Sequence, residues 1–140
     1  MLNTRASATT ISHGPLVTIP PDATLLDAAR LLHTHTIGAL AVAGEHGLVG
    51  VFGERDLVAA VSRHEDLDTA RVADHLSSPV LTARPDDTVL DVALQMLDSG
   101  TRHLPVVDDL DLPLGMVSLR DLLRPLVLQA MTPQVVGDRI

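Results

Sequence analysis

The chain has 140 residues, of which 46% are hydrophobic, so it can bury one compact core or two small cores that fold together, and it is not a disordered chain. Its net charge of −8, with ten arginines and no lysine, opposes a sequence-independent nucleic-acid binder and excludes a Schiff-base or P-loop lysine. The lack of cysteine excludes disulfides, iron–sulfur clusters and cysteine-based zinc sites, and the single aromatic residue excludes a platform for stacking bases.

The first predicted segment is a polar tail. Residues 1–13 contain no apolar stretch of signal-peptide length, and we expect them to be flexible. No run elsewhere approaches the roughly 18 apolar residues that a membrane helix needs. We therefore expect a cytoplasmic protein with no membrane partner.

A strand and a helix are predicted next. Residues 17–19 favour a short strand, which the following Pro-Asp-Ala-Thr sequence ends. Thr24 and Asp27 have the spacing of a capping box, in which each side chain binds the backbone N–H of the other. Beyond this cap, apolar residues recur at the spacing of an amphipathic helix: Leu25, Ala28, Ala29 and Leu32.

Two strands and a second helix complete the first half. Ala39–Ala43 and Leu48–Phe52 flank a Gly-Glu-His-Gly turn, which indicates a hairpin. A helix is expected from about Glu54. The acidic, polar residues 65–75 are predicted to link the two halves of the chain.

The second half of the chain repeats the first. Pro-Asp-x-Thr-x-Leu-Asp-x-Ala begins at Pro21 and again 64 residues later at Pro85. The sequence from Gly50 to Leu57 then matches that from Gly115 to Leu122, with Gly, Arg, Asp and Leu identical. Two such matches in the same order indicate a duplication.

The second repeat predicts the same elements. They are a strand at Val80–Ala83, a helix capped by Thr88 and Asp91, strands at His103–Val107 and Leu114–Val117, and a helix from about Leu119. Since proline breaks a helix interior, Pro125 is expected to open a short extra helix, Leu126–Met131.

These motifs, in this order and twice, resemble a tandem pair of CBS (cystathionine beta-synthase) domains, a Bateman module. The pieces that carry the resemblance are the strand before Pro-Asp-x-Thr, the Arg102–Val107 strand, the closing Gly-h-x-[Ser/Thr]-x-x-Asp motif, and the short helix at 72–76. The resemblance implies an α+β (α/β) fold, in which two β-α-β-β-α repeats pack into one pseudo-twofold module. It places the CBS repeats at residues 14–64 and 76–128 and leaves 129–140 as a C-terminal tail.

The resemblance also implies a function. CBS pairs are regulatory or sensing modules, of which many bind AMP, ADP or ATP and some bind S-adenosylmethionine, in clefts between the repeats. For this chain, AMP, ADP or ATP is the expected ligand, ahead of S-adenosylmethionine or NAD. They commonly form homodimers and act on target proteins. This chain is similar to small bacterial CBS proteins, so the expectation is a nucleotide-binding homodimer that requires no cofactor and no metal and acts on an unknown target protein.

The second repeat has the fuller ligand motif. Ser118 and Asp121 begin a helix, where backbone N–H groups attract phosphate and a carboxylate can bind both hydroxyls of a ribose. Arg120 could bind phosphate through its planar guanidinium. Ser118 and Asp121 also form a capping box, so a purely structural role stays open. By the resemblance, the base would lie near His103 and Pro105, with Thr82 on the opposite wall.

The first repeat has a reduced motif. Gly53 stands where the second repeat has Ser118, so the hydroxyl is lost, while Arg55 and Asp56 remain. Thr18 is the counterpart of Thr82. This site could bind weakly, bind something different, or be empty.

The sequence also bears on three other kinds of function: an adaptor, an enzyme and a metal-binding protein. The pair could be a ligand-free dimeric adaptor in which both motifs are structural. An enzyme is disfavoured, because the sequence lacks a nucleophile with a matching acid–base pair. A metal site at His33 and His35 is disfavoured, because side chains two residues apart on a helix diverge.

Overall fold

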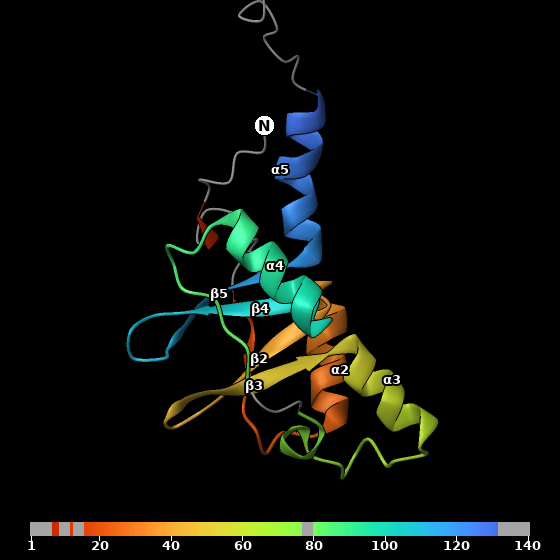
Figure 1. The fold of residues 1–140 in the computed structure, drawn as a ribbon. Helices are drawn as coiled ribbons and strands as arrows, with labels where there is room; N and C mark the ends of the chain where they lie inside the picture. The colour runs from red at the N-terminus through yellow and green to blue at the C-terminus, as the bar shows by residue number, and fades with distance from the viewer. Residues whose placement is uncertain (1–6, 9–11, 13–15, 77–79, 132–140) are drawn as a thin grey trace, which may run out of the picture.

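The first half of the chain folds into a three-stranded sheet with two helices. The computed structural model describes residues 7–8, 12, 16–76 and 80–131. In chain order, the first half contains β1 (Thr18–Ile19), α2 (Leu25–His35), β2 (Ala39–Gly44), β3 (Gly47–Gly53) and α3 (Glu54–Ser62). Strand β2 lies between a parallel β1 and an antiparallel β3 (Figure 1). The predicted hairpin and helix start are confirmed.

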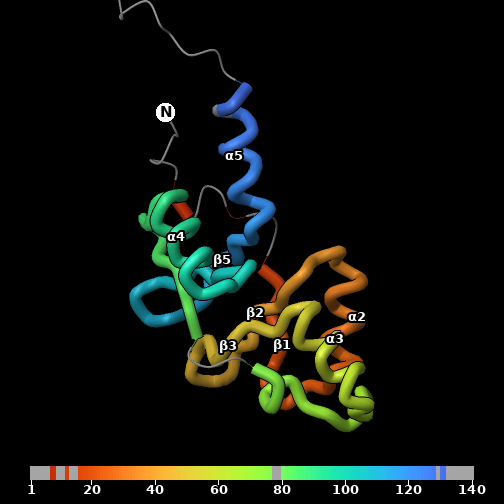
Figure 2. The backbone as a smooth tube through the Cα atoms, turned by 45° about the vertical axis from the view of Figure 1, so that its right-hand side comes forward, coloured from red at the N-terminus to blue at the C-terminus, as the bar shows by residue number. Residues whose placement is uncertain are grey.

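The second half has the same plan with one strand fewer. It contains the 3-10 helix η1 (Val72–His75), α4 (Val89–Ser99), β4 (His103–Val107), β5 (Pro113–Ser118) and α5 (Leu119–Met131). Strands β4 and β5 pair antiparallel. Figure 2 shows the first half and the second half as two neighbouring bodies, and this mixed, duplicated architecture confirms the predicted fold class.

The strand predicted at Val80–Ala83 is wrong, because only Ala83 pairs, in a single parallel bridge with Val106. The reason is Pro105. In the first repeat, the N–H of Ala41 donates to the carbonyl of Val17 at 3.1 Å. Pro105 occupies the position of Ala41 and has no N–H to donate, so this ladder bond cannot form. The carbonyl of Pro105 still accepts from Ala83 N–H at 2.9 Å, which keeps the segment in place.

Reciprocal caps begin α2 and α4, as the sequence predicts. Thr24 N–H donates to Asp27 Oδ2 at 3.2 Å, and Asp27 N–H donates to Thr24 Oγ1 at 3.1 Å. The same two bonds join Thr88 and Asp91, at 2.9 and 3.2 Å. These bonds lower the pKa of both aspartates, since they favour the carboxylate.

Helix α5 corrects the prediction made for Pro125. The helix runs unbroken from Leu119 to Met131, with Pro125 inside it, so no separate helix starts at Leu126 and the C-terminal tail does not begin at residue 129. Because proline has no N–H, residue 125 cannot donate a helix hydrogen bond to the carbonyl of Asp121. Leu122 is 2% exposed and anchors the preceding turn in the core of the second repeat.

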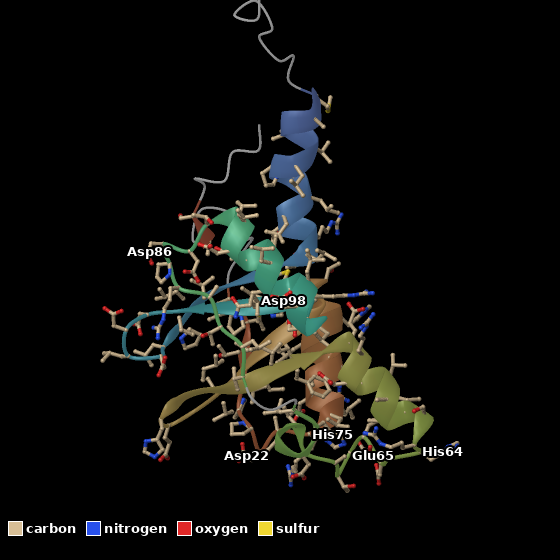
Figure 3. All side chains as sticks on the ribbon, viewed as in Figure 1. Asp22, His64, Glu65, His75, Asp86 and Asp98 are labelled. Carbon is tan, nitrogen blue, oxygen red and sulfur yellow. The ribbon has the colours of Figure 1, made fainter. Side chains whose placement is uncertain are left out.

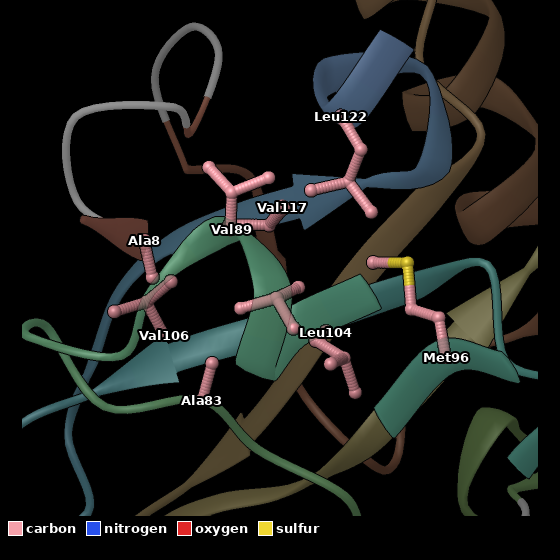
Figure 4. Packing of buried hydrophobic residues seen from close by; sticks show 9 residues of the cluster. Ala8, Ala83, Val89, Met96, Leu104, Val106, Val117 and Leu122 are labelled. Atoms are coloured by element: carbon pink, nitrogen blue, oxygen red, sulfur yellow. The ribbon is translucent and has the colours of Figure 1, made fainter. Parts of the chain in front are cut away.

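Each repeat has its own hydrophobic core. The core of the first repeat contains Phe52, Leu25, Leu40 and Ile19, and that of the second contains Leu104, Val92, Val117 and Met96. Figure 4 shows the second core, with Ala8 from the N-terminal segment pointing into it beside Val106.

The segment that precedes each repeat packs on the other repeat. Val72, which precedes the second repeat, is fully buried in the first core, and its N–H donates to Ala23 O at 2.9 Å. Ala8, which precedes the first repeat, is fully buried in the second core, and its N–H donates to Asp87 O at 2.7 Å. The prediction of a flexible tail is therefore wrong at Ala8. The rest of the predicted tail lies outside the described residues, except Ser7 and Ser12.

Candidate functional site

A cavity of about 390 Å³ lies between the two repeats, at the closing motif of the first. One side is the start of β2, the end of β3 and the first turn of α3. The other side comes from the second repeat, as the segment before Ala83 and the loop that joins α4 to β4. The lining residues are Gly38, Ala39, Val51, Gly53, Glu54, Arg55, Asp56, Val80, Leu81, Ser99, Gly100, Thr101, Arg102 and His103.

The start of α3 forms the polar floor of the cavity. Gly53 N–H donates to Asp56 Oδ2 at 2.8 Å, and Glu54 N–H donates to Gly38 O at 3.0 Å. These bonds fix the half-buried carboxylate of Asp56 at the beginning of the helix. The N-terminal end of a helix carries a partial positive charge, which suits an anionic group.

His103 crosses from the second repeat to the first. A Cβ atom at position 38 would lie 3.1 Å from both Cε1 and Nε2 of His103, and 3.3 Å from Oε1 of Glu54. A glycine at this position is what makes room for the ring. Burial lowers the pKa of His103, the carboxylates of Glu54 and Asp121 oppose this shift, and the Arg102 guanidinium reinforces it.

Both signs of charge line the cavity. Arg55 and Arg102 are exposed, one from each repeat, and the acidic Glu54 and Asp56 line the same cavity. The remaining lining is aliphatic or small, including Val51, Val80 and Leu81. The cavity therefore offers an apolar wall, one ordered carboxylate and two guanidinium groups.

The closing motif of the second repeat does not line this cavity, although Ser118 pairs with the cavity residue His103 across β4 and β5. Ser118 N–H donates to Asp121 Oδ2 at 2.7 Å, and Asp121 N–H donates to Ser118 Oγ at 3.1 Å. This is the capping box, so the structural role considered for the pair is present. Ser118, Asp121 and the exposed Arg120 do not line the cavity.

The other predicted site residues are also outside the cavity. Thr82 is half-buried, and its carbonyl accepts from Gln95 Nε2 at 3.0 Å. Pro105 is buried in β4, and Thr18 is exposed on β1. Of the residues proposed from sequence, the cavity brings together Arg55, Asp56 and His103.

Sequence reasoning missed part of the lining, mainly Val51, Val80, Leu81 and Thr101. The duplication carried a usable signal. In a pseudo-twofold pair, the loop before β4 of one repeat can lie over the closing motif of the other. Applied to this chain, the symmetry predicts that the loop before His103 lies over the closing motif that contains Asp56.

The described residues contain neither a metal-binding cluster nor a helix that could span a membrane. No group of three or more His, Asp or Glu side chains in this part of the chain could hold a metal ion. Among the described helices, none is both long enough and apolar enough to cross a membrane.

Comparisons with known proteins identify related sequences. The CBS domain pattern matches residues 8–63 and 72–128. The chain is 32% identical to an uncharacterized protein of Methanopyrus kandleri over 116 residues, which are 81% of this chain and 59% of that protein. It is 34% identical to an uncharacterized 17.7 kDa protein of Acidianus ambivalens over 110 residues, 78% of this chain and 66% of that protein. The chain thus matches less than two thirds of either relative.

Solved structures share the whole fold. A CBS domain protein from Pyrobaculum aerophilum, complexed with AMP, matches with a TM-score of 0.80 and 27% identity, over 91% of this chain and 100% of that one. The CBS domain pair of protein MJ0100, in complex with 5′-methylthioadenosine and S-adenosyl-L-methionine, matches with a TM-score of 0.82 and 26% identity, over 89% and 98%.

Proposed function

Because the chain belongs to the CBS domain family, with one CBS repeat in each half, we propose that it is a regulatory module that binds an adenosine ligand between its repeats. The observation that carries the proposal is the cavity at the start of α3, which combines an ordered carboxylate, two arginines and an apolar wall. The bound AMP, S-adenosylmethionine and methylthioadenosine of the two similar structures support adenosine as the shared chemistry.

Each part of such a ligand has a partner in the cavity. Asp56 uses Oδ2 to accept from Gly53, and its Oδ1 is placed to accept from a ribose hydroxyl. Arg55, Arg102 and the first turn of α3 attract phosphate. The base packs on Val80, Leu81 and Val51, since the chain has no tyrosine or tryptophan to stack on it.

The ligands proposed are AMP, ADP and ATP, followed by S-adenosylmethionine and NAD. The motif of Ser118, Arg120 and Asp121 is a second proposed ligand site, related to the first by the duplication. We propose further ligand contacts at Pro105 and Thr82 for the site of the second repeat. Thr18, the counterpart of Thr82, is proposed as a contact for the site of the first repeat. Ligand binding would change the affinity of the module for a target protein, without catalysis by the module.

Replacing Asp56 by alanine is expected to weaken the binding of AMP, ADP or ATP more than tenfold, about 1.4 kcal/mol, because the ribose loses its carboxylate. Isothermal titration calorimetry with each nucleotide measures the change. Asp86→Ala is the matched control, since Asp86 is an exposed carboxylate remote from the cavity lining.

The two substitutions separate the alternatives. An unchanged affinity in Asp56→Ala, together with a loss in Asp121→Ala, would move the ligand to the second motif. If none of the nucleotides, nor S-adenosylmethionine or NAD, raises the melting temperature of the unsubstituted chain, a ligand-free adaptor becomes the better account, since a ligand of the native state always stabilises it.

We also propose that the module is a homodimer, held by the outer faces of α4 and α5. Leu94 and Leu97 on α4 are 50% and 78% exposed, and Leu123 and Val127 on α5 are both 52% exposed. Exposed apolar side chains that gather on two adjacent helices mark an interaction surface.

Leu94→Asp is expected to convert a dimer into a monomer, because a carboxylate in an apolar interface is desolvated without a partner. Sedimentation velocity measures the mass. Leu110→Asp is the control, since Leu110 is 77% exposed on the β4–β5 turn. A monomeric unsubstituted chain would contradict the proposal.

A further inference from the structure

The connection between the repeats contains a half-buried histidine that the ligand proposal does not use. His75 ends η1, and its side chain is only 7% exposed. Its ring contacts Glu65, ten residues earlier and just beyond α3, whose side chain is 29% exposed. Figure 3 shows the two residues together at the end of the first repeat. The contact closes the intervening chain into a loop.

Both ring nitrogens of His75 face oxygen atoms that can only accept. Nδ1 lies 2.7 Å from the carbonyl oxygen of Arg71, and Nε2 lies 2.6 Å from Oε1 of Glu65. A neutral imidazole carries one N–H and can satisfy one of these partners, whereas the imidazolium carries two. We infer that His75 is held as the imidazolium cation and acts as a proton-dependent latch on the connection between the repeats.

The charges around the ring support the cation. Burial alone would lower the pKa of His75, but the hydrogen bonds with the Arg71 carbonyl and the Glu65 carboxylate outweigh it and raise the pKa. Arg63 opposes this, since its Nε and a terminal nitrogen bind Glu65 Oε2 at 3.0 and 2.9 Å. The guanidinium of Arg71 is engaged elsewhere, because it donates to Asp22 O at 2.7 Å.

The latch holds a loop that is fastened to the first repeat. Leu26 N–H donates to Leu67 O and Leu25 N–H donates to Ala70 O, both at 3.0 Å. Val72 then fills the first core, and Leu76 packs so closely on β3 that a Cβ at Gly50 would lie 2.8 Å from it. Val80 and Leu81, which line the cavity, come next in the sequence among the described residues.

The sign of the pH dependence follows from the raised pKa. Below the pKa of an unfolded histidine, about 6.5, both states are protonated and the contribution of the latch to stability is complete. It is lost as the pH rises through the higher pKa of folded His75. His103 acts in the opposite direction, since its lowered pKa removes stability as the pH falls below about 6.5.

The test is a titration of the histidine rings in the intact chain by nitrogen–proton correlation NMR. His75 is expected to show two protonated ring nitrogens to a pH above about 6.5, the usual pKa of an unfolded histidine. Glu65→Gln keeps an acceptor at Nε2 but removes the charge, and it is expected to lower the titration midpoint of His75. His64→Gln is the control and leaves His75 unchanged.

Stability supplies a second readout. The loss of unfolding free energy between pH 6.5 and 8.5 is expected to be smaller in His75→Gln than in the unsubstituted chain, because the variant has no latch to lose. A titration midpoint of His75 at or below about 6.5, the value of an unfolded histidine, would overturn the inference, and that experiment needs no variant. Since neither readout involves a ligand, the inference stands or falls independently of the proposed function.

Discussion

Replacing Phe52 by alanine is expected to lower the free energy of unfolding by about 3–5 kcal/mol. Phe52 is the only aromatic residue of the chain and is fully buried on β3, opposite Leu40 of β2. A core built otherwise from aliphatic side chains has no other ring that could move into the space. The cavity left by the phenyl group therefore adds to the lost transfer energy.

The measurement is urea denaturation at equilibrium, followed by circular dichroism. Val49→Ala on the same strand is the control, because Val49 is 42% exposed and its truncation removes little buried area. A loss below about 1 kcal/mol in Phe52→Ala would show that the first core does not depend on this side chain as its packing indicates.

Ala8→Asp is expected to cost about 3 kcal/mol of stability, because it places a polar group without a partner in the second core. Ala8 is fully buried, with 0% of its surface accessible to solvent, and it belongs to the core cluster that includes Val89, Val106 and Leu104. A substitution at the eighth residue of an unpacked tail would instead leave stability unchanged.

Ala73→Asp is the matched control for this experiment. Ala73 lies in the corresponding segment before the second repeat, but its side chain is exposed on η1. The same denaturation measurement applies. If both substitutions change the free energy of unfolding by the same small amount, the segment before the first repeat does not pack in the core of the second repeat.

Much of the fold could be predicted from sequence, because the signals are local. The capping residues Thr24 and Thr88 bind partners three residues away, and the hairpin at residues 44–47 is specified by its own turn. Because the chain contains two similar repeats, the same motifs predict the same helices and hairpin in each half. The helix starts at Glu54 and Leu119 follow from the same repeated motif.

The errors arise where a distant residue decides a local structure. Pro105 removes a bond that the segment before Ala83 would need to pair as a full strand, although the two are far apart in sequence. Leu122, near the start of α5, is buried in a core with residues far from it in the sequence, and the helix continues through Pro125. Ala8 has no sequence signal of burial, since its partners all belong to the other repeat.

The candidate site shows the same limit. The sequence points to the motif of Ser118 and Asp121 as the main ligand site, but the content of a motif does not determine where the two repeats leave a cavity. The cavity instead forms at Asp56, where Gly38 is small enough for His103 to reach across from the second repeat. That arrangement depends on how the two repeats pack, which no single motif encodes.

The central claim is that an adenosine ligand binds in the cavity at the start of α3, and NMR titration of the backbone amides with AMP tests it most directly. We expect the largest shifts at Gly53–Asp56, at Leu81 and at Thr101–His103, saturating together. Shifts confined to Ser118–Asp121, or no saturable shift at any amide, would contradict the claim.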